Sequence, residues 1–260
     1  MNIIVIPFVE NESKANEIIY ALRSLDQHVK DDFKVVIVGD LPKNVVGVTH
    51  IDCRPIGSRL VDSIEKIKTV FAYPEFEEVN KITRMYDDVV LLSDVDSLED
   101  LPNFHFGLYS EDSFTGSGHW WDMKARTFAF LRENKVSKCF DGQTHLPITF
   151  EKEKFLELAP EAMQNELLLE SVYVSLQEEK EHKTGDGDAA YFYGYENKRS
   201  KPSQKIEDIE KHCENATFIN FNDEGLTPAL QEFLKKKFPK PCRFEKGFKK
   251  KPNTGEKSGV

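Results

Sequence analysis

The chain lacks several features that would assign it to a particular class of protein. No apolar run approaches the ~20 residues that a helix needs to cross a bilayer, and the amino terminus shows no secretory signal pattern. There are four cysteines, none of them in a CxxC pair, which argues against zinc ribbons and disulfide scaffolds. We therefore expect a cytoplasmic protein with reduced thiols.

A net positive charge is found in the carboxy-terminal region, whereas the rest of the chain is net negative. The net charge is −10 at pH 7, which argues against a broad face for binding nucleic acid. Between Lys235 and Lys251, however, nine basic residues stand against one acid, Glu245. A solvated tail is one explanation of this run. Contact with an anionic membrane or with nucleic acid phosphates is the alternative.

The remaining composition is that of a folded protein, because 39% hydrophobic residues in a chain of 260 suffice for a substantial core. In the first half, short apolar runs rich in β-branched residues alternate with stretches of helical periodicity. We predict strands at 3–6, 35–38, 48–51 and 89–92, and amphipathic helices at 18–29 and 60–71. This order predicts an α/β fold with a mixed, mostly parallel, Rossmann-like sheet flanked by helices.

Two aspartates follow the last of these strands, where Val89 to Leu92 runs into Ser93-Asp94-Val95-Asp96. Ligands of open α/β sheets bind beyond the carboxyl ends of the strands. Paired carboxylates placed there suit Mg²⁺ or Mn²⁺, which prefer oxygen ligands and bridge to substrate phosphates. A helix cap or a surface loop is the alternative explanation. The spacing resembles that of the metal-binding carboxylates in nucleotide-sugar transferases of the GT-A fold.

Several short segments resemble the Stealth family of sugar-phosphate transferases and its bacterial and phage relatives, in the same order along the chain. Residues Glu17 to Leu25 are similar to the early helix of that family, with its Glu, Tyr and Leu-Arg-Ser. Ser93 to Asp96 stands where those proteins carry an Asn-Asp-Asp group. Thr144 to Pro147 is similar to a segment with a His-x-Pro core, and Phe244-Glu245 resembles part of the carboxy-terminal block.

Two features depart from that family: its opening motif is absent, and the acidic pair is spaced rather than adjacent. We predict a GT-A-like domain over residues 1–238 and a basic, partly disordered extension over 239–260. The expected activity is metal-dependent transfer of a sugar from a nucleotide-sugar donor to a hydroxyl acceptor, either a glycan or a hydroxylated base in DNA. The alternatives are a Stealth-type hexose-1-phosphate transferase and a non-catalytic module that binds sugars or nucleotides.

Candidate residues for the metal and the donor come from several elements. Asp94 and Asp96 are the expected metal ligands, and Asp94 is also counted among the donor-binding residues. Asp223 is a third candidate ligand, although it equally suits the cap of the helix that follows it. Arg59 and Lys66 are expected to face the donor phosphates, with a solvated helix face as the alternative reading.

Candidate bases for the acceptor hydroxyl lie further along the chain. His145 titrates near neutral pH and suits a base or a metal ligand, although a lone histidine is more often structural. Asp141 and Asp188 are further candidates, and turn formation explains Asp188 equally well. Trp120 and Trp121 stand beside glycines and suit either a sugar-stacking wall for the acceptor or the packing of a second sheet.

Overall fold

A five-stranded sheet forms the centre of the protein. The computed structural model describes residues 1–10, 17–109, 116–185, 187–194, 199–201 and 204–248. The strand order is β3-β2-β1-β4-β7, and β7 alone runs antiparallel to its neighbour. The strands are β1 (Asn2–Phe8), β2 (Phe33–Gly39), β3 (Thr49–Ile51), β4 (Lys81–Arg84) and β7 (Ile148–Glu151). The prediction of a mixed, mostly parallel sheet flanked by helices is confirmed.

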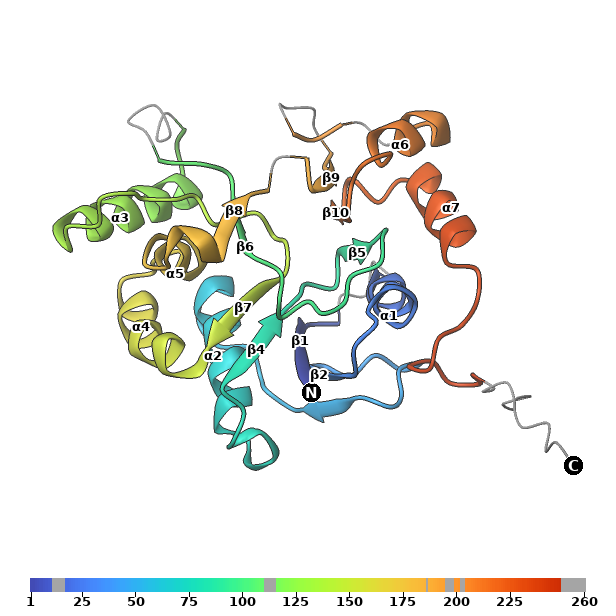
Figure 1. Cartoon of the computed structure of the whole chain (residues 1–260), viewed down its shortest axis with the longest axis horizontal. Coiled ribbons are helices and arrows are strands. Elements are labelled where there is room, and N and C mark those ends of the chain that lie inside the picture. Colours follow the sequence, from blue (N-terminus) through green and yellow to red (C-terminus); the bar gives the residue numbers. More distant parts are fainter. Residues whose placement is uncertain (11–16, 110–115, 186, 195–198, 202–203, 249–260) are drawn as a thin grey trace, which may run out of the picture.

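Helices cover both faces of this sheet (Figure 1). One face packs its apolar side chains, such as Val5 and Val36, against α2, α4 and α5. The other face, with Ile4 and Ile37, packs against α1 and a second, smaller sheet. The helices of these layers, with α3 beside α5, are α1 (Glu17–His28), α2 (Arg59–Ala72), α3 (His119–Glu133), α4 (Lys152–Gln164) and α5 (Leu169–Ser175).

The second sheet has three strands in the order β5-β10-β9, and α6 and α7 pack beside it. These elements are β5 (Val89–Leu91), β9 (Ala189–Phe192), β10 (Phe218–Phe221), α6 (Ile206–His212) and α7 (Pro228–Lys237). A further pair consists of β6 (Asn103–His105) and β8 (His182–Thr184), and short 3₁₀ turns occupy Pro74–Phe76 and Glu179–Glu181.

The strand predicted at 89–92 exists as β5, but the prediction that it joins the parallel sheet is wrong. It pairs antiparallel with β10, with Val89 opposite Asn220 and Leu91 opposite Phe218. The place beside β1 belongs instead to β4, where Arg84 pairs with Val5. After β4 the chain turns and β5 runs back beside α1, where the Leu91 amide donates to Ser24 Oγ.

The segment after α7 is part of the domain, so the boundary expected at residue 238 does not separate a packed core from a tail. Cys242 and Phe244 are buried in the core that includes α1. Arg23 of α1 forms a bidentate ion pair with Glu245, at 2.7 Å for both contacts, and also donates to the Phe238 carbonyl. The last ten residues, which were expected to be disordered, lie outside the described residues.

The helices do not suggest a membrane-spanning element. Among the described segments, none combines the length and the apolar character that crossing a bilayer requires.

We expect Phe244→Ala to lower the free energy of unfolding by about 3–5 kcal/mol, because the phenyl ring is 3% exposed and its loss leaves a cavity. Phe248→Ala is the matched control, since that ring is 41% exposed. Urea unfolding of the two variants provides the measurement. Equal stability of both would show that residues 239–248 are an appended tail.

Candidate functional site

Two adjacent carboxylates follow β4 at the carboxyl end of the parallel strands. The Met85 amide donates to the Val5 carbonyl of β1, and Tyr86-Asp87-Asp88 then leaves the sheet edge. Asp87 and Asp88 are partly exposed. They therefore stand at the sheet edge where ligands of open α/β sheets bind.

The surroundings make it unfavourable for both groups to carry charge. Desolvation raises the pKa of Asp87 to about 6, although the positive charge of Lys66 opposes the shift. Desolvation also raises the pKa of Asp88 well above its usual range, and the negative charges of Asp87 and Glu17 add to this effect. A cation at this edge would relieve the repulsion.

Lys66 lies beneath this edge rather than on a solvated helix face. It is 1% exposed, and its ammonium group is 2.8 Å from Asp62 one turn earlier in α2. Its side chain passes under Gly39, where a Cβ would stand 2.1 Å from the Phe8 carbonyl and 3.2 Å from Lys66 Cε. Glycine at the end of β2 thus allows β1, β2 and the buried cation to approach one another.

A buried ion pair anchors the other side of β4. Arg84 and Glu170, at the start of α5, are joined by a short contact, and their side chains are 4% and 8% exposed. Burial opposes ionisation of Glu170, but the charge of Arg84 and hydrogen bonds from Arg84 and Gln143 lower its pKa to about 2. The guanidinium also stacks on the Tyr86 ring at 4.2 Å. This pair therefore fixes the residue next to Asp87.

His145 lies near the end of β4, and its part in a site stays a prediction. It adopts a left-handed backbone conformation with φ of 58°, and its ring lies 5.4 Å from that of Tyr86. Desolvation and the positive charge of Arg84 lower the pKa of His145. The residue is exposed, so its imidazole is accessible to a ligand at this edge.

The small sheet reaches the site through β10. Asn220 is fully buried and its amide nitrogen lies 3.3 Å from Asp88 Oδ1. The side-chain oxygen Oδ1 of Asn220 accepts a 2.7 Å hydrogen bond from the Tyr193 hydroxyl. Because the side-chain amide donates to Asp88 and accepts from Tyr193, it ties the turn between β4 and β5 to the segment that follows β9.

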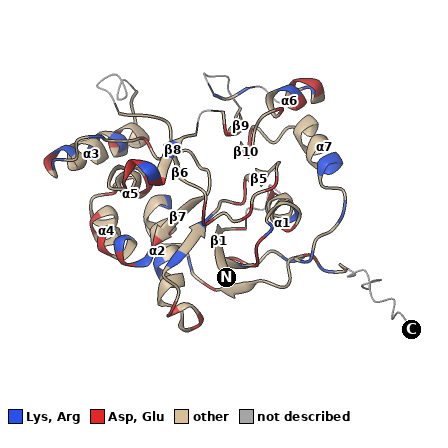
Figure 2. Ribbon diagram, viewed as in Figure 1, with Lys and Arg blue, Asp and Glu red and all other residues tan. Residues whose placement is uncertain are grey.

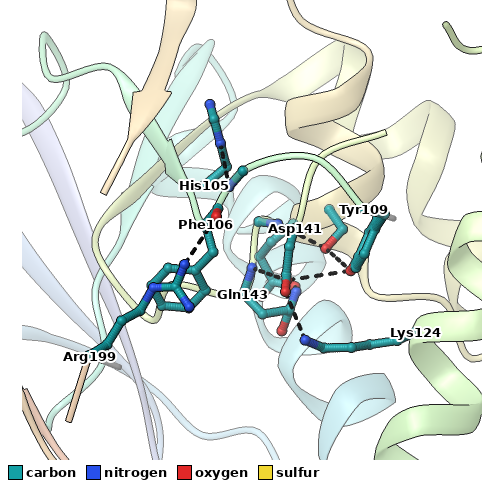
Figure 3. A network of polar contacts seen from close by, with 11 residues as sticks. His105, Phe106, Tyr109, Lys124, Asp141, Gln143 and Arg199 are labelled. Carbon is teal, nitrogen blue, oxygen red and sulfur yellow. Dashed lines mark hydrogen bonds and ion pairs between the residues drawn. The ribbon is translucent and has the colours of Figure 1, made fainter. Parts of the chain in front are cut away.

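Asp141 belongs to a hydrogen-bond network that extends from this group (Figure 3). It accepts hydrogen bonds from Lys124 at 2.7 Å, from the Gln143 backbone amide at 3.2 Å and from the Tyr109 hydroxyl at 3.4 Å. The Gln143 side chain donates to Glu170 at 2.8 Å. Asp141 is thus linked to the end of β4, and its oxygens are already engaged.

Asp94 and Asp96 lie at the opposite end of the sheet, so the expectation that they stand at its carboxyl edge is wrong. The Val95 amide donates to the His28 carbonyl at the end of α1, and the Asp31 amide donates to the Asp96 carbonyl. Asp94 forms an ion pair with Lys30 and lies 2.8 Å from His28 Nδ1. The physical reason is that β5 runs away from the carboxyl edge.

The other predicted residues divide between the two ends. Asp188 precedes β9; its backbone carbonyl accepts from the Thr217 amide and its side chain pairs with Lys183. Because Thr217 lies just before β10 and Asp88 lies beside the end of β10, Asp188 is at the opposite end of that strand from Asp88. Asp223 follows β10 on the same side as Asp88, in an exposed turn. Arg59 is the exposed first residue of α2, beyond the carboxyl edge. The structure therefore does not bring Asp94, Asp96 and Asp223 together.

No group of three or more His, Cys, Asp or Glu side chains within the described ranges has the arrangement of a metal site. Any cation at Asp87 and Asp88 would therefore take its remaining ligands from solvent or substrate, which is usual for Mg²⁺. Comparison of the chain with models of known protein families finds no match, and a search of curated proteins returns no significant match. Function is therefore inferred from the chemistry of the site.

Sequence reasoning missed Asp87 and Asp88 because they precede an apolar run instead of following one. The strand that carries them reads Lys-Ile-Thr-Arg, which has no apolar periodicity. The one local signal is the adjacent acidic pair itself, and such pairs also occur elsewhere in the chain, as at Asp31 and Asp32.

We expect Asp87→Asn to stabilise the protein at pH 7.5 by about 1–3 kcal/mol, because the native carboxyl has a pKa of about 6 against 3.8 unfolded. The native state binds the proton more tightly, so stability is lost as pH rises from about 4 to 6. The advantage of the variant should shrink as pH falls through the same window. Urea unfolding at pH 7.5 and 4.5 measures this, and a variant less stable than the wild type at pH 7.5 would refute it.

We expect Arg84→Met to cost about 3–5 kcal/mol of stability, because it leaves Glu170 buried without its counter-charge. The double variant Arg84→Met, Glu170→Met should recover most of the loss, since two apolar side chains can replace a buried ion pair. Equilibrium unfolding of the single and double variants tests this. Additive losses in the double variant would contradict it.

Proposed function

We propose that the protein is a metal-dependent transferase that moves a sugar from a nucleotide-sugar donor to a hydroxyl acceptor. The observation that carries the proposal is the pair Asp87 and Asp88 at the end of a central parallel strand, with both pKa values raised. Two such carboxylates, completed by substrate phosphates, suit Mg²⁺ or Mn²⁺. When bound, the cation would offset the charge that builds on the departing diphosphate.

The residues around the pair have distinct parts in this proposal. Lys66 places a fixed positive charge behind Asp87 and limits the repulsion there. Arg84 holds Glu170 and Tyr86 in place, so the two carboxylates are presented from a rigid strand end. His145, exposed and beside Tyr86, is the base that we assign to the acceptor hydroxyl.

A second candidate is transfer of a sugar-1-phosphate. The observation that favours it is that Asp87 and Asp88 are adjacent, as the acidic pair of the Stealth family is, whereas the resemblance itself points to Ser93 to Asp96. The two reactions break different bonds. Sugar transfer breaks the anomeric C–O bond and releases a nucleoside diphosphate, whereas phosphosugar transfer breaks the P–O bond of the pyrophosphate and releases a nucleoside monophosphate.

The acceptor that we propose is a glycan, and a hydroxylated base in DNA is the alternative. Basic side chains continue from the end of α7 into the segment that follows it (Figure 2). Lys235, Lys237 and Lys240 are exposed there. Contact of this region with an anionic membrane or with DNA stays a prediction, and such contact would weaken as salt concentration rises.

We expect Asp88→Asn to lower metal-dependent release of nucleotide by about 100-fold or more, because it removes a charge that the cation needs. Asp96→Asn is the matched control and should retain activity, because Asp96 lies at the opposite end of the sheet. The measurement is incubation with a panel of nucleotide sugars, with and without Mn²⁺, followed by mass spectrometry of the released nucleotide.

The products separate the candidates. A nucleoside diphosphate supports sugar transfer, and a nucleoside monophosphate supports phosphosugar transfer. Donor binding that is metal-independent and equal in wild type and Asp88→Asn, with no release in any reaction, supports a non-catalytic binding module. Equal losses in Asp88→Asn and Asp96→Asn would contradict the assignment of the site.

A further inference from the structure

The first turn of α3 presents an aromatic surface that the proposed reaction has not used. Both tryptophans of the chain, Trp120 and Trp121, lie in this turn. Trp120 is 40% exposed, which is high for so large an apolar side chain. Trp121 packs against Gly116, where a Cβ would stand 2.0 Å from the indole. Packing against a second sheet therefore does not explain the exposed indole of Trp120.

Lys124, one turn further along α3, fixes the two indoles. Its ammonium group lies 5.5 Å from the centre of each ring system and 2.7 Å from Asp141. The Lys124 and Asp141 side chains are 13% and 15% exposed, so the ion pair is well shielded from solvent. Such an arrangement restrains the rings through cation–π contacts and leaves one indole facing outward.

This aromatic surface is connected to the carboxylate site. Asp141 accepts from the Gln143 amide, and the Gln143 side chain donates to Glu170. Glu170 in turn binds Arg84 and lies 3.5 Å from the Tyr86 hydroxyl, next to Asp87. A continuous set of hydrogen bonds and ion pairs thus leads from α3 to the end of β4, part of which is seen in Figure 3.

We infer that Trp120, Trp121 and Lys124 form an acceptor subsite that binds a neutral hexopyranose ring of a glycan. The place of this subsite in the reaction rests on the proposed function. A pyranose ring has an apolar face of C–H groups and a rim of hydroxyls. The exposed Trp120 indole matches the face. Lys124, 13% exposed and paired with Asp141, holds the indoles in place and leaves the hydroxyls of the rim to solvent.

Charge favours a neutral sugar over a nucleic acid at this surface. A nucleobase also stacks on an indole, but the attached phosphates require several cations nearby. Here the Lys124 charge is balanced by Asp141, and the exposed Asp122 stands directly beside Trp121. The surface therefore has little net positive charge to offer a phosphate backbone.

The intrinsic fluorescence of the full chain tests this inference, because both tryptophans lie in the subsite. The probes are maltohexaose, cellohexaose and chitohexaose, with a single-stranded DNA oligonucleotide as comparison. We expect a saturable change with at least one oligosaccharide, which persists in Trp121→Phe, where Trp120 is the single reporter. No change with any oligosaccharide, or saturation by the oligonucleotide alone, would overturn the inference.

Calorimetry provides the second test. Trp120→Ala should bind the responding oligosaccharide about tenfold more weakly than the wild type does. The control is Leu156→Ala on α4, which removes a side chain of similar exposure (39%) and should leave the affinity unchanged. Unchanged affinity in Trp120→Ala would also overturn the inference. Asp88→Asn should keep sugar binding while losing nucleotide release, so failure of the subsite and failure of the proposed reaction give different results.

Discussion

The ion pair of Arg84 and Glu170 is the interaction on which the arrangement of this protein depends most. It joins the central strand β4 to α5 in a place that is almost free of solvent. Both charges need each other there, because an isolated buried charge costs several kcal/mol. The pair also positions side chains on two sides. The guanidinium orients Tyr86 next to the carboxylates, and Glu170 accepts a hydrogen bond from Gln143 of the loop before β7.

The charged groups at the carboxyl edge cost the folded protein stability, which agrees with the ligand-binding part that we propose for them. Asp87 and Asp88 repel each other in partly desolvated positions, and Lys66 compensates only part of this repulsion. A folded protein tolerates such a cost where the rest of the structure over-determines the geometry. Here β4 is held between β1 and β7, and Asn220 holds Asp88 from the second sheet.

The fold class and the elements from β1 to α2 were predictable because they depend on local patterns. The helix from Glu17 to His28 and the strand from Phe33 to Gly39 show their periodicity directly. Strand β4 was not predictable in this way, because its buried positions include Thr83 and Arg84 in place of apolar residues. Thr83 is hydrogen-bonded to the Thr149 hydroxyl at 2.8 Å and Arg84 is paired with Glu170, partners that are 66 and 86 residues away.

The sequence by itself determined that the chain is an α/β protein, with acidic residues at strand ends and His145 and Asp141 as site candidates. The tertiary structure decided which acidic pair lies at the carboxyl edge. Asp94 and Asp96 follow an apolar strand as clearly as any sequence motif requires, yet β5 runs back along α1 and carries them to the other end. Strand direction depends on long-range pairing with β10, and a local pattern contains no information about that partner.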